Sequence, residues 1–284
     1  WRAWPRLGPA TIAEQRRFAM LAARLGAQAS VLECMAIRPA LVLACERSLV
    51  RATIAVITNL RPDHLEDLPT AGALAEGALA LVPAGGVLVA SDEALHACPG
   101  LRAHAAARGT RVIEVSTTGL DVRRANRALA EAACIAAGID APRFDAAEAV
   151  PDPGAFAVHE VMLRGRRFRF ADAFACNDVA SFDRLRRAGA TAADPQASWL
   201  ALLCHRADRP LRSLQFLDHL AALPDRPRLL IAGGAFWLRR AARRRGLDVL
   251  ALRLPAVASA NSFAARLADS LAPAVPEGAV VWGV

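Results

Sequence analysis

Several side chains able to bind a cation lie just after residues 53–57, an apolar, β-branched segment that is typical of a buried strand. They are Thr58, Asn59, Asp63 and His64. In open α/β sheets ligands bind at the carboxyl ends of the strands, so polar groups delivered there are candidates for chemistry. Asn and Asp also begin turns and cap helices, so this run does not define a site by itself.

A second predicted strand, residues 30–32, ends in the same way with Glu33. Two adjacent parallel strands that end in a carboxylate and in Asn, Asp and His would together supply ligands for a hard cation. Mg²⁺ is such a cation, and it favours oxygen ligands. The pair of strand ends therefore predicts a functional site where neither strand alone would.

The composition is that of one large or two medium globular domains. The sequence has 284 residues, 55% of them hydrophobic. Its first residues lack the apolar core of a signal peptide, and its longest weakly polar run, residues 77–90, is too short to span a bilayer. We therefore expect a soluble, cytoplasmic protein.

The formal net charge of +8 comes entirely from arginine, because the sequence contains no lysine. Tyrosine is absent as well, and this pattern indicates compositional bias of the source genome more than a selected basic surface. The densest arginine runs, 164–169 and 239–245, suit a solvated hairpin and the exposed side of a helix. No nucleic-acid partner is expected. The six cysteines lack zinc-site spacing and are expected to be reduced thiols.

Alternating helices and strands predict a mostly parallel sheet covered by helices in the first half of the chain. Helices are expected over residues 11–25, 70–80 and 122–137, and strands near 29–33, 53–58, 86–90 and 111–115. The last of these helices has Leu129, Ala133 and Ala136 on its inward face.

A proline- and glycine-rich stretch at residues 150–154 indicates a hinge, and we place a domain boundary near residue 150. The predicted domains are residues 1–150 and residues 151–284. In the second domain we expect a hairpin that turns near Gly165, then strands at 199–203 and 228–232 and a helix over 213–223.

Five short motifs occur in order along the chain. They are V-L-E-C-M-A at 31–36, T-N-x-R-x-D-H-L at 58–65, P-D-P-G at 151–154, F-A-x-N-D at 174–178 and R-A-D-R at 206–209. Together they resemble the Mur ligase superfamily, and most closely the ATPase/ligase subunit of capsule-type poly-γ-glutamate synthase. The resemblance implies an α/β fold: a central ATPase domain with helices on both faces of a mostly parallel sheet, followed by a Rossmann-like C-terminal domain.

The resemblance also implies a reaction. Enzymes of this family use ATP to phosphorylate a substrate carboxylate, and an incoming amine then displaces phosphate from the acyl phosphate to form an amide. Phosphoryl transfer depends mainly on positioning and on neutralising negative charge. The implied function is an ATP-dependent amide ligase that forms γ-glutamyl amides, with ATP and Mg²⁺ as cofactors.

Individual roles follow from family position. The resemblance implies metal contacts by Glu33 and His64, nucleotide contacts by Asn59, Asn126 and Arg206, and catalytic roles for Asn177, Asp178, Arg206 and Asp208. Arginine suits such a site because its planar fork binds phosphate or carboxylate. Family position also implies that the R-A-D-R segment helps the second domain to close over ATP.

Each of these residues has a structural alternative. His64 would be a helix-start histidine bonded to the backbone, and Asn59 and Asp63 would shape a turn. Asn126 would be a solvated helix residue. The arginines and Asp208 of the R-A-D-R segment would form an exposed ion-pair cluster of little energetic worth.

The glycine-rich G-K-[ST] loop with which this family binds phosphate has no counterpart here, because the sequence lacks lysine. The opening residues resemble the family segment that follows that loop, and residues 280–284 resemble a strand whose following helix is absent. We therefore expect a fragment of a ligase subunit, without its N-terminal P-loop unit and with an incomplete C-terminal domain, that is inactive alone.

Three other functions remain open at this point. One is another Mur-type ligase, such as a folylpolyglutamate or muramyl-peptide enzyme. The second is a non-catalytic partner that keeps the ligase fold. The third and weakest is an arginine-rich RNA-binding protein, which gives no reason for Glu33 or for the Asn59, Asp63 and His64 set. For the leading function, the resemblance implies glutamate and the poly-γ-glutamate chain as substrates. It also implies small membrane subunits as partners, and hence a peripheral location at the inner face of the membrane.

Overall fold

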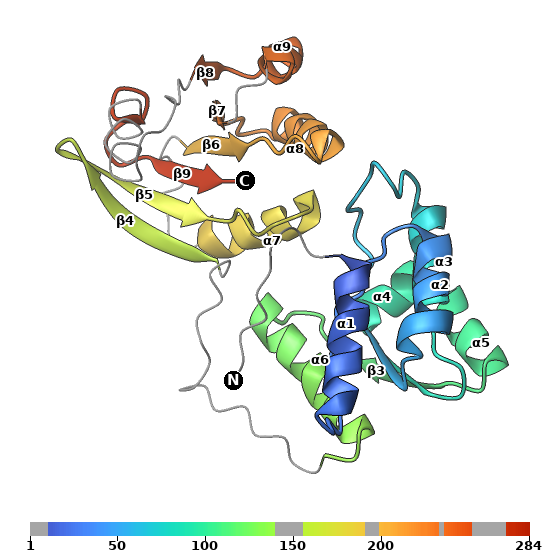
Figure 1. The fold of residues 1–284 in the computed structure, drawn as a ribbon. Helices are drawn as coiled ribbons and strands as arrows, with labels where there is room; N and C mark the ends of the chain where they lie inside the picture. The colour runs from blue at the N-terminus through green and yellow to red at the C-terminus, as the bar shows by residue number, and fades with distance from the viewer. Residues whose placement is uncertain (1–10, 140–155, 191–198, 233–235, 252–270) are drawn as a thin grey trace. The chain divides into compact units, whose positions relative to one another are not determined.

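The computed structural model describes residues 11–139, 156–190, 199–232, 236–251 and 271–284 (Figure 1). The chain forms two compact units, one made of residues 1–62 and 67–144 and the other of residues 63–66 and 145–284. The predicted hinge at 150–154 and the predicted boundary near residue 150 lie outside the described residues and stay predictions.

The first unit contains a parallel sheet with strand order β1-β2-β3. Its strands are β1 (Ile54–Ile57), β2 (Val87–Ser91) and β3 (Arg111–Val115). Its helices are α1 (Ile12–Arg24), α2 (Pro39–Cys45), the π-helix η1 (Glu46–Val50), α3 (Ala71–Ala80), α4 (Asp92–Ala97), α5 (Gly100–Ala107) and α6 (Val122–Ala136). The predicted strands near 53–58, 86–90 and 111–115 and the three predicted helices are confirmed.

Helices cover both faces of this sheet. Leu88 and Ala90 of the central strand β2 are fully buried in one cluster with side chains of α3, α4 and α5. Successive strand residues point to opposite faces, so Val89, also fully buried, faces the other side. There α6 contacts all three strands, with Leu129 only 2% exposed. The prediction of helices on both faces is confirmed.

The strand predicted at residues 30–32 is wrong, because these residues are irregular and Val31 is 95% exposed. A strand is stabilised by hydrogen bonds to a neighbour, and residues 30–32 pair with none of the strands β1, β2 and β3. As an edge strand, β1 is itself less buried than predicted, since Val56 is 41% exposed. Glu33 therefore does not lie at the end of a strand.

The second unit contains a six-stranded sheet of order β4-β5-β9-β6-β7-β8, in which only β4 and β5 are antiparallel. Its strands are β4 (Ala157–Leu163), β5 (Arg166–Asp172), β6 (Trp199–Cys204), β7 (Arg228–Ala232), β8 (Val249–Ala251) and β9 (Val280–Gly283). Its helices are α7 (Val179–Ala190), α8 (Pro210–Ala222) and α9 (Phe236–Arg244).

The predicted hairpin is confirmed, and Figure 1 shows it as the long yellow-green pair β4 and β5. Arg164 and Gly165 form its turn with positive φ angles of 50° and 79°. Helix α8 begins earlier than predicted, at Pro210, because proline suits the first helical position, where no backbone N–H donor is needed.

Both faces of the second sheet are buried. Ala201 and Leu203 of β6 pack in one cluster with Phe182 and Phe216 from the helices. The alternate residues of β6, Leu200 and Leu202, pack in a second cluster that includes side chains of the segment 271–279. Near-continuous apolar strands are typical of a parallel sheet covered on both sides. Within the described ranges, no helix is long and apolar enough to span a bilayer.

Candidate active site

The loop after β1 is shaped by its own polar side chains. The amide oxygen of Asn59 accepts a hydrogen bond from the backbone N–H of Arg61 at 3.2 Å, as in an Asx turn. The Arg61 guanidinium donates to both carboxylate oxygens of Glu93, at 2.6 Å each. Asn59 thus has the turn-shaping role that was its structural alternative, and its contact with a nucleotide stays a prediction.

Asp92 joins the end of β2 to the segment after β3. Its carboxylate accepts hydrogen bonds from the backbone N–H and hydroxyl of Thr117, at 3.0 and 2.7 Å. It also accepts from the N–H and hydroxyl of Thr118, at 3.3 and 2.8 Å. The hydrogen bonds from Thr117, chiefly from its hydroxyl, hold the pKa of the Asp92 carboxyl well below its usual range. Asp92 is therefore a fixed anion at this edge of the sheet.

We expect the stability contributed by Asp92 to be lost in acid. The ordinary pKa of this carboxyl is 3.8 and its pKa in the folded protein is lower, so the contribution is complete above pH 3.8. As the pH falls below this value toward the folded pKa, the difference in unfolding free energy between the wild type and D92N narrows. Urea unfolding of both proteins at a series of pH values measures that difference, and one that does not change with pH would contradict the assignment.

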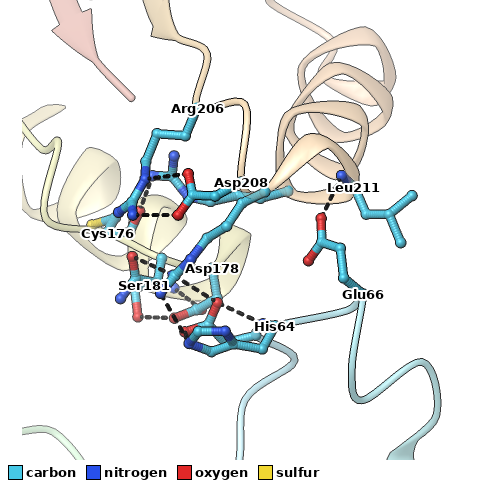
Figure 2. A network of polar contacts seen from close by, with 12 residues as sticks. His64, Glu66, Cys176, Asp178, Ser181, Arg206, Asp208 and Leu211 are labelled. Atoms are coloured by element: carbon cyan, nitrogen blue, oxygen red, sulfur yellow. Dashed lines mark hydrogen bonds and ion pairs between the residues drawn. The ribbon is translucent and has the colours of Figure 1, made fainter. Parts of the chain in front are cut away.

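Residues of two other sequence motifs contact Arg209 of the R-A-D-R motif in the second unit, which includes residues 63–66. Figure 2 shows the polar network around them, with His64, Asp178 and Arg206 labelled. The Arg209 guanidinium lies 3.4 Å from Oδ1 of Asp63 and 3.4 Å from Oδ1 of Asn177. It also lies 2.9 Å from Nε2 of His64. The predicted residues His64 and Asn177 are thereby brought together, through an arginine that was not itself predicted as a site residue.

Glu66 is joined to the start of α8. The backbone N–H of Leu211 donates to Oε1 of Glu66 at 2.8 Å, while the residue before the helix, Arg209, provides no side-chain cap. A carboxylate is stabilised at this end of a helix by the free N–H groups and by the helix dipole. Segment 63–66 thus supplies acidic side chains to both Arg209 and α8.

His64 is held in an uncommon state. Its φ angle is 51°, a left-handed conformation that His adopts more readily than most residues, and its N–H donates to Oδ1 of Asp63 at 2.7 Å. Because a guanidinium has no acceptor, Nε2 of His64 must accept from Arg209, which places the ring proton on Nδ1. This arrangement engages the lone pair of Nε2 and places a positive charge beside it. Metal binding by His64 therefore stays a prediction, and it requires Arg209 to move.

Asp178 caps α7. Its Oδ1 accepts from the backbone N–H of Ser181 at 2.7 Å and its Oδ2 accepts from the Ser181 hydroxyl at 2.7 Å. Asp178 is 8% exposed, whereas the preceding Asn177 is exposed. The carboxylate thus has a structural role as an N-cap, and its catalytic role stays a prediction.

We expect D178A to lower the unfolding free energy by about 0.5–2 kcal/mol, because the alanine leaves the first turn of α7 without its cap. D178N is the matched control, since asparagine caps helices about as well as aspartate. Urea unfolding of the three proteins measures the effect. A D178N as unstable as D178A would show that the charge, and not the cap, is what stabilises this position.

The arginines around α8 differ in their surroundings. Arg206 donates to both oxygens of Asp208, at 3.1 and 2.7 Å, in an exposed ion pair of the kind that the structural alternative described. Arg212 is only 7% exposed, donates to the carbonyl of Cys176, and lies 5.0 Å from the ring centroid of Phe216. Burial, followed by the nearby charge of Arg209, lowers the pKa of the Arg212 guanidinium.

Glu33 and Asn126 are exposed side chains of the first unit, Glu33 in an irregular segment and Asn126 on α6. The described residues contain no cluster of three His, Cys, Asp or Glu side chains suited to a metal. Mg²⁺ needs only one or two protein carboxylates when phosphates and waters complete its shell, so the oxygens of Glu33 fit it chemically. The roles of Glu33 and Asn126 stay predictions.

Three residues near these sites were not singled out from the sequence, Asp92, Glu93 and Arg212, and Arg209 was identified only as part of the R-A-D-R motif, without a site role. A signal for each was present. Asp92 and Glu93 directly follow a predicted strand, the same criterion that selected Asn59 and His64. Arg209 and Arg212 are three positions apart at a helix start, a spacing that places side chains on one face.

Comparison with known proteins agrees with the motifs. Residues 158–284 match the family model described as the poly-gamma-glutamate synthase CapB C-terminal domain. Over 243 residues the chain is 29% identical to PGA synthase CapB of Bacillus subtilis (strain 168), which covers 80% of this chain and 60% of that protein. Over 191 residues it is 31% identical to the capsule biosynthesis protein CapB of Bacillus anthracis, covering 63% of this chain and 40% of that protein.

The chain therefore spans 60% and 40% of the length of these two relatives. Among solved structures, folylpolyglutamate synthase of Mycobacterium tuberculosis, complexed with ADP and AMPPCP, is similar with a TM-score of 0.52 and 19% identity. The match covers 83% of this chain and 62% of that one, and it shows a shared fold. The resemblance predicted from the sequence is thus confirmed: residues 158–284 match the CapB C-terminal domain family, on a chain that is similar to CapB proteins and shares its fold with a folylpolyglutamate synthase.

Proposed function

We propose that this chain is part of an ATP-dependent ligase that forms γ-glutamyl amides through an acyl phosphate, as in poly-γ-glutamate synthesis. The observation that supports this most is the CapB-type domain at residues 158–284. In it, Asn177 follows β5 and Arg206 follows β6, and both strands run parallel to β9 between them. Their loops therefore lie at one edge of the sheet, the edge at which open α/β sheets bind ligands.

The proposed reaction has two steps. A γ-carboxylate oxygen of glutamate attacks the γ-phosphorus of ATP and ADP leaves. The nitrogen of an incoming amine then attacks the acyl carbon, phosphate leaves, and the amine proton passes to solvent. Both steps move negative charge, so cationic groups that bind phosphate or carboxylate lower their barriers. Arg206 and Arg209 are the described side chains best suited to this role in the second unit, since both are exposed or half-buried cations at the sheet edge.

Other contacts belong to the same proposal. Glu33 would contribute an oxygen ligand to Mg²⁺, and Asn59 and Asn126 would contact the nucleotide. Glutamate and the growing poly-γ-glutamate chain would be the substrates, and small membrane subunits would be the partners. These assignments rest on the similarity to two proteins named CapB, of which one is a PGA synthase and the other a capsule biosynthesis protein.

The proposal is tested by ADP release from the full-length protein that contains this chain, supplied with ATP, Mg²⁺ and single candidate substrates. We expect ADP release that depends on glutamate, and a lower rate in R206A. The isolated 284-residue chain should show no turnover, because it has no lysine with which to form a G-K-[ST] loop. ADP release that depends on a folate or a muramyl peptide would instead identify another Mur-type ligase. The absence of ADP release with every substrate would favour a non-catalytic partner.

A further inference from the structure

Two consecutive carboxylates, Asp92 and Glu93, follow the central strand of the first sheet and lie in the first turn of α4, where Asp92 also accepts a hydrogen bond from the backbone N–H of Glu93 at 2.9 Å. Ser91 already caps α4, since its hydroxyl accepts from the backbone N–H of Ala94 at 2.9 Å. The two acidic side chains reach in different directions instead, toward the segments that follow β1 and β3. Their positions call for an explanation beyond helix formation.

Glu93 holds the segment after β1. Both of its oxygens bind the Arg61 guanidinium at 2.6 Å, in a fork geometry that fixes orientation as well as distance. The Arg61 side chain is only 13% exposed and that of Glu93 is 34% exposed, so water screens this pair less than a surface pair. The backbone N–H of Arg61 in turn binds the side chain of Asn59. Glu93 therefore acts on Asn59 through a single intervening residue.

Asp92 holds the segment after β3 in the same way. It accepts hydrogen bonds from the hydroxyls of Thr117 and Thr118, at 2.7 and 2.8 Å, and from the backbone N–H groups of both residues. Because β2 lies between β1 and β3, two adjacent residues at its end bind the segments after both neighbours. Asp92 and Glu93 thus join the segments at the carboxyl ends of all three strands of the sheet.

We propose that Asp92 and Glu93 are positioning residues, which hold the loops at the carboxyl edge of the first sheet so that Asn59 is presented for nucleotide binding. The nucleotide contact of Asn59 rests on the function proposed above, whereas the joining of the loops does not. Neither carboxylate needs to touch a substrate for this role. Glu93 acts through Arg61, and Asp92 keeps the opposite side of the same edge in place.

The first experiment measures hydrogen–deuterium exchange of peptides covering residues 58–62 in the 284-residue chain. E93Q removes a charge-assisted interaction of about 1.5–3 kcal/mol, which corresponds to about tenfold or more in a local opening equilibrium. We expect exchange of the Arg61 amide to rise by about that factor, and the swapped variant R61E/E93R to restore most of the protection. The matched control is E131Q, which removes a more exposed Arg–Glu pair on α6, between Arg127 and Glu131. It should leave these peptides unchanged.

The second experiment measures steady-state kinetics of the full-length protein. We expect E93Q to raise KM for ATP by about tenfold with a smaller change in kcat, and R61E/E93R to recover part of the loss. Unchanged exchange in E93Q would overturn the joining of the loops. Faster exchange with an unchanged KM for ATP would overturn the positioning role. If the wild type showed no ATP turnover, the proposed function would fail, and the exchange result would still decide whether Glu93 holds the loop.

Discussion

Replacement of Phe182 by alanine is expected to destabilise the second unit by about 3–5 kcal/mol. Phe182 is fully buried on α7, and its ring lies edge-on to Phe216 and to Trp282, with centroids 5.8 Å apart in each case. It therefore joins two helices to the central strand β9. Truncation removes buried apolar surface and these ring contacts, and it leaves a cavity that close-packed neighbours fill only in part.

Urea unfolding followed by tryptophan fluorescence measures this effect, because Trp199, Trp237 and Trp282 all belong to the second unit. F236A is the matched control. Phe236 is 70% exposed, so its truncation should change the unfolding free energy by no more than about 0.5 kcal/mol. Equal losses in F182A and F236A would contradict the packing described for this core.

Replacement of Gly86 by alanine should destabilise the first unit by about 1–3 kcal/mol or more. A Cβ atom at this position would clash with the backbone oxygen of Thr53 and would lie 3.1 Å from the Pro83 ring. The same oxygen accepts the hydrogen bond from Val87 N–H, at 2.9 Å, next to the start of the β1–β2 pairing. The clash is with backbone, so relief requires the strands to move apart.

G77A is the control for this substitution. Gly77 lies in α3, a Cβ atom there would meet nothing within 4 Å, and alanine is favoured over glycine in a helix by roughly 1 kcal/mol. We therefore expect G77A to match or exceed the wild type in thermal unfolding, while G86A unfolds at a clearly lower temperature. A G86A protein as stable as G77A would show that the two strands do not approach each other in this way.

Much of the fold follows from local sequence signals. The apolar runs that became β2, β6 and β7 are buried on both faces, so their composition alone marks them as strands. The hairpin is equally visible, because Gly165 supplies a positive φ between two alternating segments. These signals depend on a few neighbouring residues and need no knowledge of the rest of the chain.

The strand expected at residues 30–32 shows the limit of such signals. Val31 and Leu32 have the composition of a strand, yet strand formation depends on a partner, and the described sheet begins at β1. The same limit applies to the site. The motifs identified Asp63, His64 and Asn177, but contacts such as that between Arg209 and His64 join residues 145 positions apart. Spacing along the chain carries no information about such contacts.

Charge placement was also only partly predictable. Arg206 and Asp208 were expected to matter because they lie in a motif, and they form an exposed pair. Arg212 lies outside the motif and is the buried cation of the group. The burial of Arg212 depends on how α8 packs against the sheet. The sequence pattern predicts that the helix packs there, but it does not predict which single arginine becomes buried.

The acyl phosphate is the feature that distinguishes the proposed ligase from a protein that only keeps the fold. Its most direct test uses glutamate labelled with ¹⁸O in the γ-carboxylate, together with ATP, Mg²⁺ and an amine acceptor, in the full-length protein. Phosphate released during amide formation should carry ¹⁸O, because a γ-carboxylate oxygen stays with phosphorus when the amine displaces it. Formation of the γ-glutamyl amide with unlabelled phosphate would contradict the proposed reaction.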